Sequence, residues 1–224
     1  MPVPAHARLG TRGQPEESRA AILKAAIKEF AEYGIAGART DAIAKAARVN
    51  KALLYYYFTD KEAIYEAVLD HVFSGLRDTV VPVLDGDAPP RQKLLNYLGA
   101  YFDYIAANPR FPRVVQGEWI RTGTERTPQM QRIAKEYFRP IYQKLGEVLA
   151  QGIAAGEFRP VDPIHFIPSM VAIIVFYFSA APVIKSLMKI DPLAPERIAE
   201  RRAFVLDFIS AALFTKPLAA GDRA

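Results

Sequence analysis

Side chains able to bind a nucleic acid lie together on one short segment in the first third of the chain. Lys51, Ala52 and Leu53 begin a predicted helix, and the aromatic run 55–58 (Tyr-Tyr-Tyr-Phe) ends it. A lysine can donate to a guanine edge or a phosphate, a tyrosine hydroxyl can bond a phosphate, and alanine or leucine can contact a thymine methyl. A helix this short cannot bury four aromatic rings against one core, so we expect at least one tyrosine to face outward.

Two short helices joined by a tight turn must position this segment. The residue pattern predicts helices over about 41–47 and 51–57, with Asn50 as the N-cap of the second. A helix over 18–33 precedes them, and a longer one begins at Lys61. Small or apolar residues stand where the two short helices must cross: Ile43, Ala44, Ala47, Val49 and Leu54. This is the helix-turn-helix arrangement, whose second helix presents its N-terminal residues to the major groove of DNA.

The segment 43–62, IAKAARVNKALLYYYFTDKE, resembles the signature of TetR-family transcriptional regulators, and the resemblance extends over about 18–66. The length of the chain, its helical character and its divergent C-terminal body fit the same family. The resemblance implies a homodimer with an N-terminal three-helix DNA-binding domain and a C-terminal body that binds a small-molecule effector. A regulator of this kind usually represses transcription from a palindromic operator until the effector releases it.

The residues expected to contact a double-stranded DNA operator are Arg39, Thr40, Arg48, Asn50, Lys51, Ala52, Leu53, Tyr55, Tyr56, Tyr57 and Lys61. Lys51 is expected to reach a base or a phosphate, and Tyr56 and Lys61 to reach phosphates. Tyr55 either packs against the first helix or reads a base, and both interpretations stay open.

Three positions depart from the family pattern. Arg48 stands where the family often has glycine. If the turn needs a positive φ at this position, arginine adopts it with more strain than glycine, but it adds a cation near DNA. Tyr57 stands where histidine is frequent, and a tyrosine can still bond a phosphate. Arg39 stands where a small capping hydroxyl residue is common. Thr40 is therefore expected to cap the helix one residue later, which leaves Arg39 free for a phosphate.

Positive charge is concentrated near the N-terminus. Residues 1–61 carry ten Lys or Arg and six Asp or Glu, so they hold +4 of the net charge of +5. A local basic excess is typical of a protein that binds a polyanion. Arg8 and Arg12 belong to a Pro- and Gly-rich tail that either enters a minor groove or stays disordered.

The composition argues against an enzyme or a metalloprotein. The chain has no Cys and only three His, which are far apart, so disulfides, thiol catalysis and Cys-based metal sites are excluded. Nucleophile-elbow, zinc-protease, P-loop and dinucleotide-binding motifs are missing. We expect no catalytic residue, no metal and no cofactor. The polar N-terminal segment, which lacks the apolar core of a signal peptide, favours a cytoplasmic protein.

The predicted fold is all-α with about nine helices, because no segment shows the sustained alternation of a strand. A helix break is expected over 80–90, which contains three Pro and an Asp-Gly pair. The expected domains are a flexible basic tail at 1–16, a helix-turn-helix domain at 17–66, an effector-binding and dimerisation domain at 67–214, and a C-terminal tail at 215–224.

The stretch 163–184 contains no Asp, Glu, Lys or Arg and is long enough to cross a membrane. Pro168 within it favours a soluble helix that is buried on several sides. In the TetR family the last two long helices of each subunit form a four-helix dimer interface. We therefore expect no membrane partner, with a membrane-anchored regulator as the alternative, and a dimer interface built from Phe166, Ile174, Phe176, Phe204 and Phe208.

The C-terminal body is rich in aromatic residues, which can enclose an apolar cavity with hydroxyl groups at its wall. The residues expected to line an effector site are Tyr97, Tyr101, Tyr104, Glu118, Trp119, Arg121, Tyr137 and Phe138. Core packing is the alternative for each aromatic side chain. Since this lining carries few charges, we expect a mainly apolar or aromatic effector with one or two polar groups.

Overall fold

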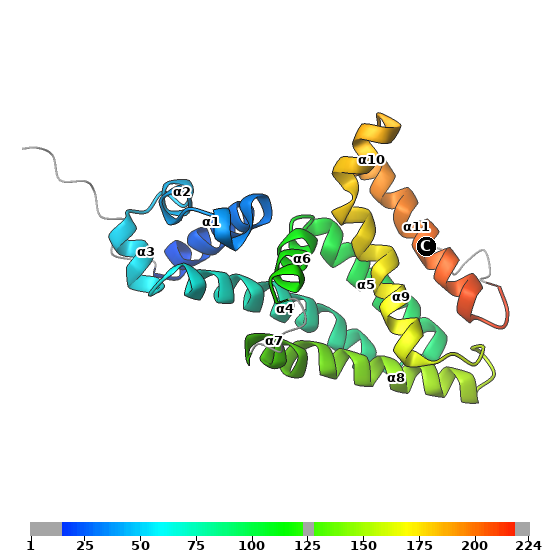
Figure 1. The fold of residues 1–224 in the computed structure, drawn as a ribbon. Helices are drawn as coiled ribbons and strands as arrows, with labels where there is room; N and C mark the ends of the chain where they lie inside the picture. The colour runs from blue at the N-terminus through cyan, green and yellow to red at the C-terminus, as the bar shows by residue number, and fades with distance from the viewer. Residues whose placement is uncertain (1–14, 123–127, 218–224) are drawn as a thin grey trace, which may run out of the picture. The chain divides into compact units, whose positions relative to one another are not determined.

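The structure, a computed structural model, describes residues 15–122 and 128–217, which are helical apart from turns and one isolated bridge between Phe158 and Phe214 (Figure 1). The chain divides into two compact units. The first comprises the residues up to Val72 together with Arg113–Arg121, and the second comprises Phe73–Pro112 and the chain from Thr122 onward. The all-α prediction is confirmed. Arg8 and Arg12 lie outside the described residues.

The first unit contains the three N-terminal helices, the first part of α4 and most of α6. Their bounds are α1 Pro15–Gly37, α2 Thr40–Ala46, α3 Lys51–Tyr57, α4 Lys61–Asp85 and α6 Phe111–Thr122. Within α1 the helical geometry stops at Gly34, whose φ of 63° is left-handed, so the predicted end of this helix is confirmed. The core of the unit includes Ile22, Phe30, Ile43, Leu54, Phe58, Ile64 and Tyr65.

Local interactions fix the turn between α2 and α3 and the start of α4. The side chain of Asn50 accepts a hydrogen bond of 2.7 Å from the amide of Leu53, which confirms the predicted N-cap. Asp60 caps α4 in the same way, by accepting from the amide of Ala63 at 2.7 Å. Arg48 has a φ of 57°, so the turn does use a left-handed residue at the position where glycine is frequent.

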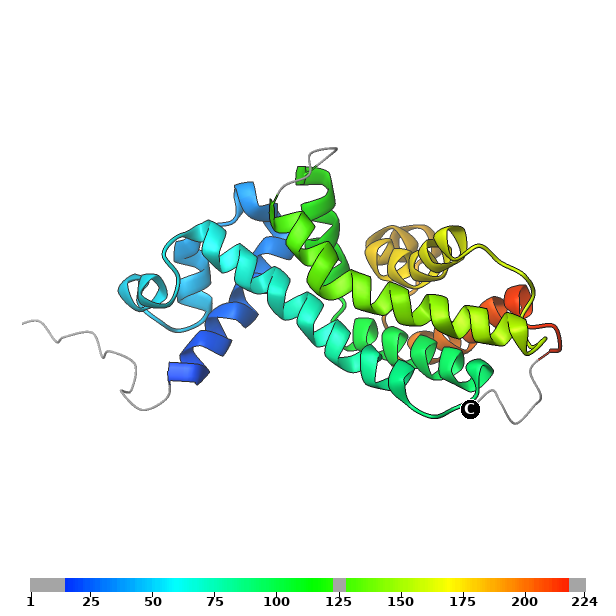
Figure 2. The same ribbon diagram turned by 90° about the horizontal axis from the view of Figure 1, so that it is seen from below.

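The second unit is a helical bundle centred on α5 (Pro90–Ala107), which packs against α8, α9 and α11 (Figure 2). The other helices are α7 Pro128–Ile133, α8 Arg139–Ala154, α9 Pro163–Ser179, α10 Ala181–Met188 and α11 Pro195–Leu213, with a π-helical turn at Ala134–Phe138. The described residues form more helices than the nine expected. One predicted helix is divided into α7, the π-turn and α8, and α10 follows α9 as a separate helix.

The predicted break over 80–90 is wrong in its first half. Helix α4 continues to Asp85 with Pro82 inside it, and the turn falls at residues 86–89. Val80 and Leu84 are buried in the core on either side of the proline. The burial of these side chains therefore outweighs the hydrogen bond that proline cannot donate.

Helix α9 begins with a side-chain cap, since Asp162 accepts a hydrogen bond from the amide of Ile164 at 2.9 Å. Pro168 lies inside α9 without ending it. Among the described residues, no single helix is long and apolar enough to cross a membrane; α9 and α10 meet that criterion only as a pair, and they are bent by 61°.

Candidate nucleic-acid interface and effector region

Helix α3 is attached to the first unit mainly through one side chain and leaves most of its surface open. Leu54 is fully buried, whereas Lys51, Ala52, Tyr55 and Tyr56 are exposed. Tyr56 is the most open of the three tyrosines, with 79% of its surface exposed. The expectation that at least one tyrosine of this run faces outward is therefore confirmed.

Two side-chain contacts join the start of α2 to α3. The ammonium of Lys51 lies 2.9 Å from a carboxylate oxygen of Asp41, and the hydroxyl of Thr40 lies 3.2 Å from that of Tyr55. The ammonium, which bonds the carboxylate, lowers the pKa of Asp41, and the carboxylate raises the pKa of Lys51. The Tyr55 contact is structural in part, but Tyr55 remains 40% exposed, so a DNA contact stays a prediction.

Lys61 contacts the protein backbone. Its ammonium lies 3.4 Å from the carbonyl oxygens of Ala36 and Ala38, and its side chain is partly buried. This ammonium therefore ties the start of α4 to the segment that follows Gly34. A phosphate contact by Lys61 stays a prediction, and sequence reasoning missed the structural role because it depends on chain segments 23 to 25 residues apart.

The cap of α2 differs from the prediction. Arg39 is the N-cap residue, with extended backbone and no side-chain cap, and Thr40 is the first residue of the helix. The amide of Arg39 donates to the carboxylate of Glu29 at 3.1 Å, which satisfies one of the amides at the start of the helix that have no acceptor within it. The side chains of Arg39 and Arg48 are exposed, so both are placed where an approaching phosphate could meet them.

Three of the predicted DNA contacts lie at the edge of the open surface. Tyr57 and Leu53 are partly buried, and the ring of Tyr57 meets that of Tyr56 edge-on with 5.3 Å between centroids. Asn50 is exposed, and its side-chain oxygen accepts the capping hydrogen bond from Leu53. Their contacts with DNA stay predictions.

Two tyrosines of the predicted effector site lie side by side within the second unit. Tyr97 and Tyr101, both on α5 and both buried, stack with 5.9 Å between ring centroids. Burial raises the pKa of both hydroxyls, and Tyr142 on α8 raises them further. Sequence reasoning left Tyr142 out of the site because its approach to α5 depends on the packing of α8 against that helix.

Three further aromatic residues of that prediction lie around α4 of the same unit. Tyr137, in the π-turn, stacks on Phe73 at 6.0 Å, and Phe138 meets the same ring edge-on at 5.0 Å. The hydroxyl of Tyr104 lies so close to Gly75 that a Cβ there would be 2.5 Å from it. These contacts are consistent with core packing as well as with a cavity wall.

The last three residues of the predicted effector site belong to the first unit. Glu118 is fully buried in α6, and Trp119 is 46% exposed. Arg121 lies at the end of the same helix, where its side chain is outside the described part of the structure. A cavity that these residues share with the α5 tyrosines stays a prediction.

The predicted dimer residues divide into exposed and buried members. Phe176 on α9 is 69% exposed, and Phe204 and Phe208 on α11 are 52% and 53% exposed and stack on each other. Phe166 is partly buried. Ile174 is fully buried in the core of its own chain, so its assignment to a surface between subunits is wrong.

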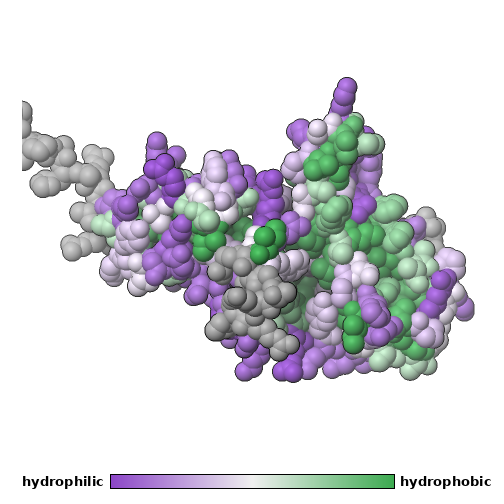
Figure 3. All heavy atoms as spheres, in the orientation of Figure 1, coloured by the Kyte–Doolittle hydropathy of each residue, from purple (hydrophilic) through white to green (hydrophobic). Residues whose placement is uncertain are grey.

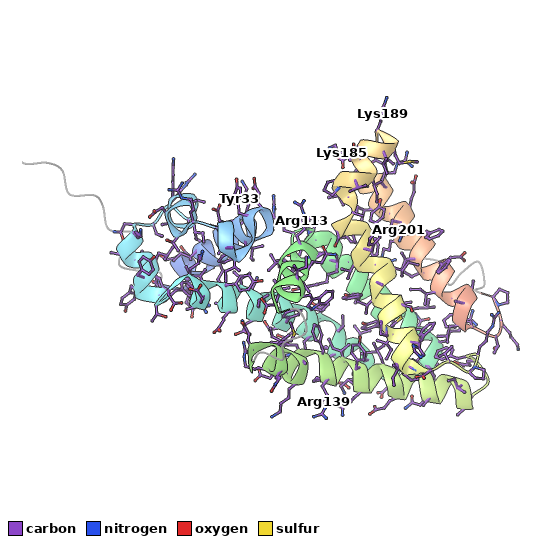
Figure 4. All side chains as sticks on the ribbon, in the orientation of Figure 1. Tyr33, Arg113, Arg139, Lys185, Lys189 and Arg201 are labelled. Carbon is purple, nitrogen blue, oxygen red and sulfur yellow. The ribbon has the colours of Figure 1, made fainter. Side chains whose placement is uncertain are left out.

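Sequence reasoning missed further exposed apolar residues of the second unit. They are Ile164 on α9, Val183, Leu187 and Met188 on α10, and Ile190 beyond it. Figure 3 shows hydrophobic residues gathered on the surface at the α10 end of the second unit, and Figure 4 shows Lys185 and Lys189 at its outer tip. Arg201 joins α11 to α9 by donating to the carbonyl of Ile173 at 2.8 Å.

Two family models match the chain. Residues 22–68 match the family described as bacterial regulatory proteins, tetR family, and residues 90–209 match the tetracyclin repressor-like C-terminal domain. The first match contains the helix-turn-helix and its cap, and the second contains the helices from α5 to most of α11. Together they account for both units.

Individual relatives agree with the two models. The transcriptional repressor NicS of Pseudomonas putida is 26% identical over 207 residues, which cover 89% of this chain and 94% of NicS. The transcriptional regulator RutR of Escherichia coli K12 is 26% identical over 167 residues, 75% of this chain and 76% of RutR.

Among solved structures, the ketosteroid transcriptional regulator KstR2 of Mycobacterium tuberculosis has the same fold, with a TM-score of 0.73, 20% identity and coverage of 93% of this chain and 98% of KstR2. The chain belongs to the TetR family of DNA-binding transcriptional regulators and is not an enzyme.

Proposed function

We propose that the protein is a repressor that binds a palindromic operator as a homodimer and is released by a small molecule. The observation that carries this proposal is the open surface of α3, where Lys51, Ala52, Tyr55 and Tyr56 are exposed and Leu54 alone is fully buried. These side chains offer one ammonium, two hydroxyls and a methyl group, which together match phosphates and base edges of the major groove. Because its partner is DNA, we place the protein in the cytoplasm.

The dimer surface is proposed to consist of the outer faces of α9 and α11. Phe176, Phe204 and Phe208 are large apolar side chains with at least half of their surface exposed. Exposed apolar residues that gather in one place are typical of interaction sites. A homodimer is typical of the family and supplies a twofold axis, which explains why two copies of α3 would read two symmetric half-sites.

The effector is proposed to bind beside Tyr97 and Tyr101 on α5, with Tyr142 on α8 as a further polar group. A tyrosine hydroxyl is protonated at neutral pH, and burial raises the pKa of Tyr97 and Tyr101 further, so both can donate to an acceptor of the ligand. Stacked rings of this kind suit a mainly apolar or aromatic molecule.

The switch is proposed to act through α4, because this single helix carries residues of both units. In the first unit Tyr65 of α4 meets Phe30 edge-on at 5.0 Å, and in the second unit Phe73 of α4 stacks on Tyr137. A ligand that alters the packing around Phe73 can change the separation of the two recognition helices in a dimer, which must stay near one DNA turn, about 34–36 Å. The ligand must bind the released conformation more tightly.

Selection of bound fragments from genomic DNA, followed by footprinting, tests the proposal. We expect two symmetric half-sites on one face of the duplex and an affinity that falls steeply with salt. A dimer without sequence preference, or a footprint over one isolated half-site, would contradict it.

A further inference from the structure

The ion pair between Asp41 and Lys51 lies on the surface that is proposed to approach DNA. Lys51 is the first residue of α3 and Asp41 is near the start of α2, so the contact of 2.9 Å bridges the two helices of the motif. A carboxylate at such a place is unexpected, because it repels a phosphate and cancels one of the positive charges that attract DNA.

Folding stability does not explain this pair. The side chains of Lys51 and Asp41 are 55% and 59% exposed. Ion pairs between exposed groups contribute little to the free energy of folding because water and salt screen them. The Thr40–Tyr55 contact also bridges α2 and α3, which pack on each other, and Leu54 of α3 is fully buried, so the two helices are held without the ion pair.

The chemistry of the pair matches one kind of base pair. In the major groove guanine presents two acceptors, O6 and N7, and cytosine presents the N4 amino donor. An ammonium has three donors, so Lys51 can keep one hydrogen bond to Asp41 and direct the others at guanine. The carboxylate beside it can accept from the cytosine amino group, whereas an adenine amino group would meet the ammonium unfavourably.

We propose that Asp41 determines specificity: together with Lys51 it reads one G·C base pair in each half-site, and it prevents Lys51 from binding phosphates of any sequence. This inference rests on the proposed operator binding. It adds to that function an acidic residue on α2 and the base pair that this residue selects.

The test compares the full-length wild-type dimer with Asp41→Asn on the operator obtained by selection. Each base pair is replaced symmetrically in both half-sites, and binding is followed by fluorescence anisotropy. For Asp41→Asn we expect discrimination at one G·C position to fall by roughly five- to 100-fold. Binding to an unrelated duplex should become tighter at low salt and should depend more steeply on salt concentration, because Lys51 then neutralises a phosphate.

Glu66→Gln is the matched control. It removes the same charge from an exposed residue on α4 and should leave discrimination unchanged at every position. Lys51→Met should lose the same G·C preference as Asp41→Asn, and the double variant should lose no more than the single ones, since the two side chains act as a unit.

The outcomes separate the inference from the function on which it rests. Unchanged discrimination in Asp41→Asn, or an equal loss at every base pair, overturns the role of Asp41 while operator binding stands. A wild-type protein that prefers no sequence overturns the proposed function, and the inference with it. Thermal unfolding of each variant, which we expect to match the wild type, shows that any loss of discrimination does not come from misfolding.

Discussion

The ammonium of Lys61 lies 3.4 Å from the carbonyl oxygen of Ala38, and equally far from that of Ala36. The residue that the TetR signature places at the start of α4 therefore ties this helix to the end of α1. The observed backbone contact and the predicted phosphate contact of Lys61 can be measured separately.

Lys61→Met should lower the free energy of unfolding by about 1 kcal/mol, because two carbonyl groups lose a charged donor. If Lys61 also neutralises a phosphate, the variant should bind every DNA sequence more weakly, with a salt dependence reduced by about one counterion per subunit. Urea unfolding measures the first effect and a salt titration the second. A variant with lower stability but an unchanged salt dependence would leave Lys61 with the structural role only.

Tyr56→Phe isolates a phosphate contact. Tyr56 is 79% exposed, so loss of its hydroxyl should leave the unfolding midpoint unchanged. Binding to the operator and to unrelated DNA should weaken alike, by roughly 1 kcal/mol, since a phosphate contact carries no sequence information. Tyr33→Phe is the control, because Tyr33 is an exposed tyrosine on α1. A loss confined to the operator would indicate that Tyr56 reads a base instead.

The starts and ends of helices α1 to α4 show which structural features can be predicted from residues adjacent in the sequence. The cap at Asn50 and the stop at Gly34 follow from residues within a single turn, and both are predictable from the sequence. The expected cap at Thr40 fails although it is equally local: the helix already begins at Thr40, whose hydroxyl contacts that of Tyr55, 15 residues later, at 3.2 Å. Pro82 fails as a break for a similar reason, since burial of its neighbours keeps α4 intact.

The uncharged run 163–184 shows a second limit. Hydrophobic periodicity identifies the buried face of a helix only where polar residues mark the other face. In α9 almost every side chain is apolar, so the buried Ile174 and the exposed Phe176 look alike in the sequence. The same limit applies to the effector region, where the approach of Tyr142 to Tyr101 depends on residues of different helices.

Phe204→Glu tests the dimer surface. A charge on this exposed face of α11 should yield a folded monomer, because the side chain does not belong to the core of its own chain. The monomer should bind the operator far more weakly, since it contacts one half-site only. Light scattering gives the mass, and circular dichroism confirms the helices. Ile120→Glu, at an 83% exposed residue of α6, is the control that should remain dimeric.

Gly75→Ala and Gly146→Ala form a pair with opposite expectations. A Cβ at Gly75 would lie 2.5 Å from the hydroxyl oxygen of Tyr104, so this variant should lose about 1–3 kcal/mol of stability through overpacking. A Cβ at Gly146 in α8 meets nothing within 4 Å, so alanine should stabilise that helix by about 0.5–1 kcal/mol. Urea unfolding measures both. Equal effects would mean that Tyr104 does not pack on Gly75.

The tyrosines of α5 predict how stability depends on pH. Burial raises the pKa of Tyr97 and of Tyr101, so the folded protein keeps both protons at a pH where the unfolded chain loses them. Their contribution is fully present below the unfolded pKa of about 10 and is lost as the pH rises further. The free energy of unfolding should therefore fall above about pH 10. In a Tyr97→Phe, Tyr101→Phe double variant this fall should be smaller, because neither residue can ionise.

The same double variant tests the effector site at neutral pH, where both hydroxyls are protonated donors. Aromatic ligands found by thermal shift on the wild type should bind the variant more weakly and release DNA less readily, by roughly 1 kcal/mol for each hydrogen bond lost. Their binding should not change between pH 7 and 9, because neither hydroxyl titrates in that range. Tyr33→Phe again serves as the control. Ligands that release DNA equally well from the double variant would place the effector site elsewhere in the body.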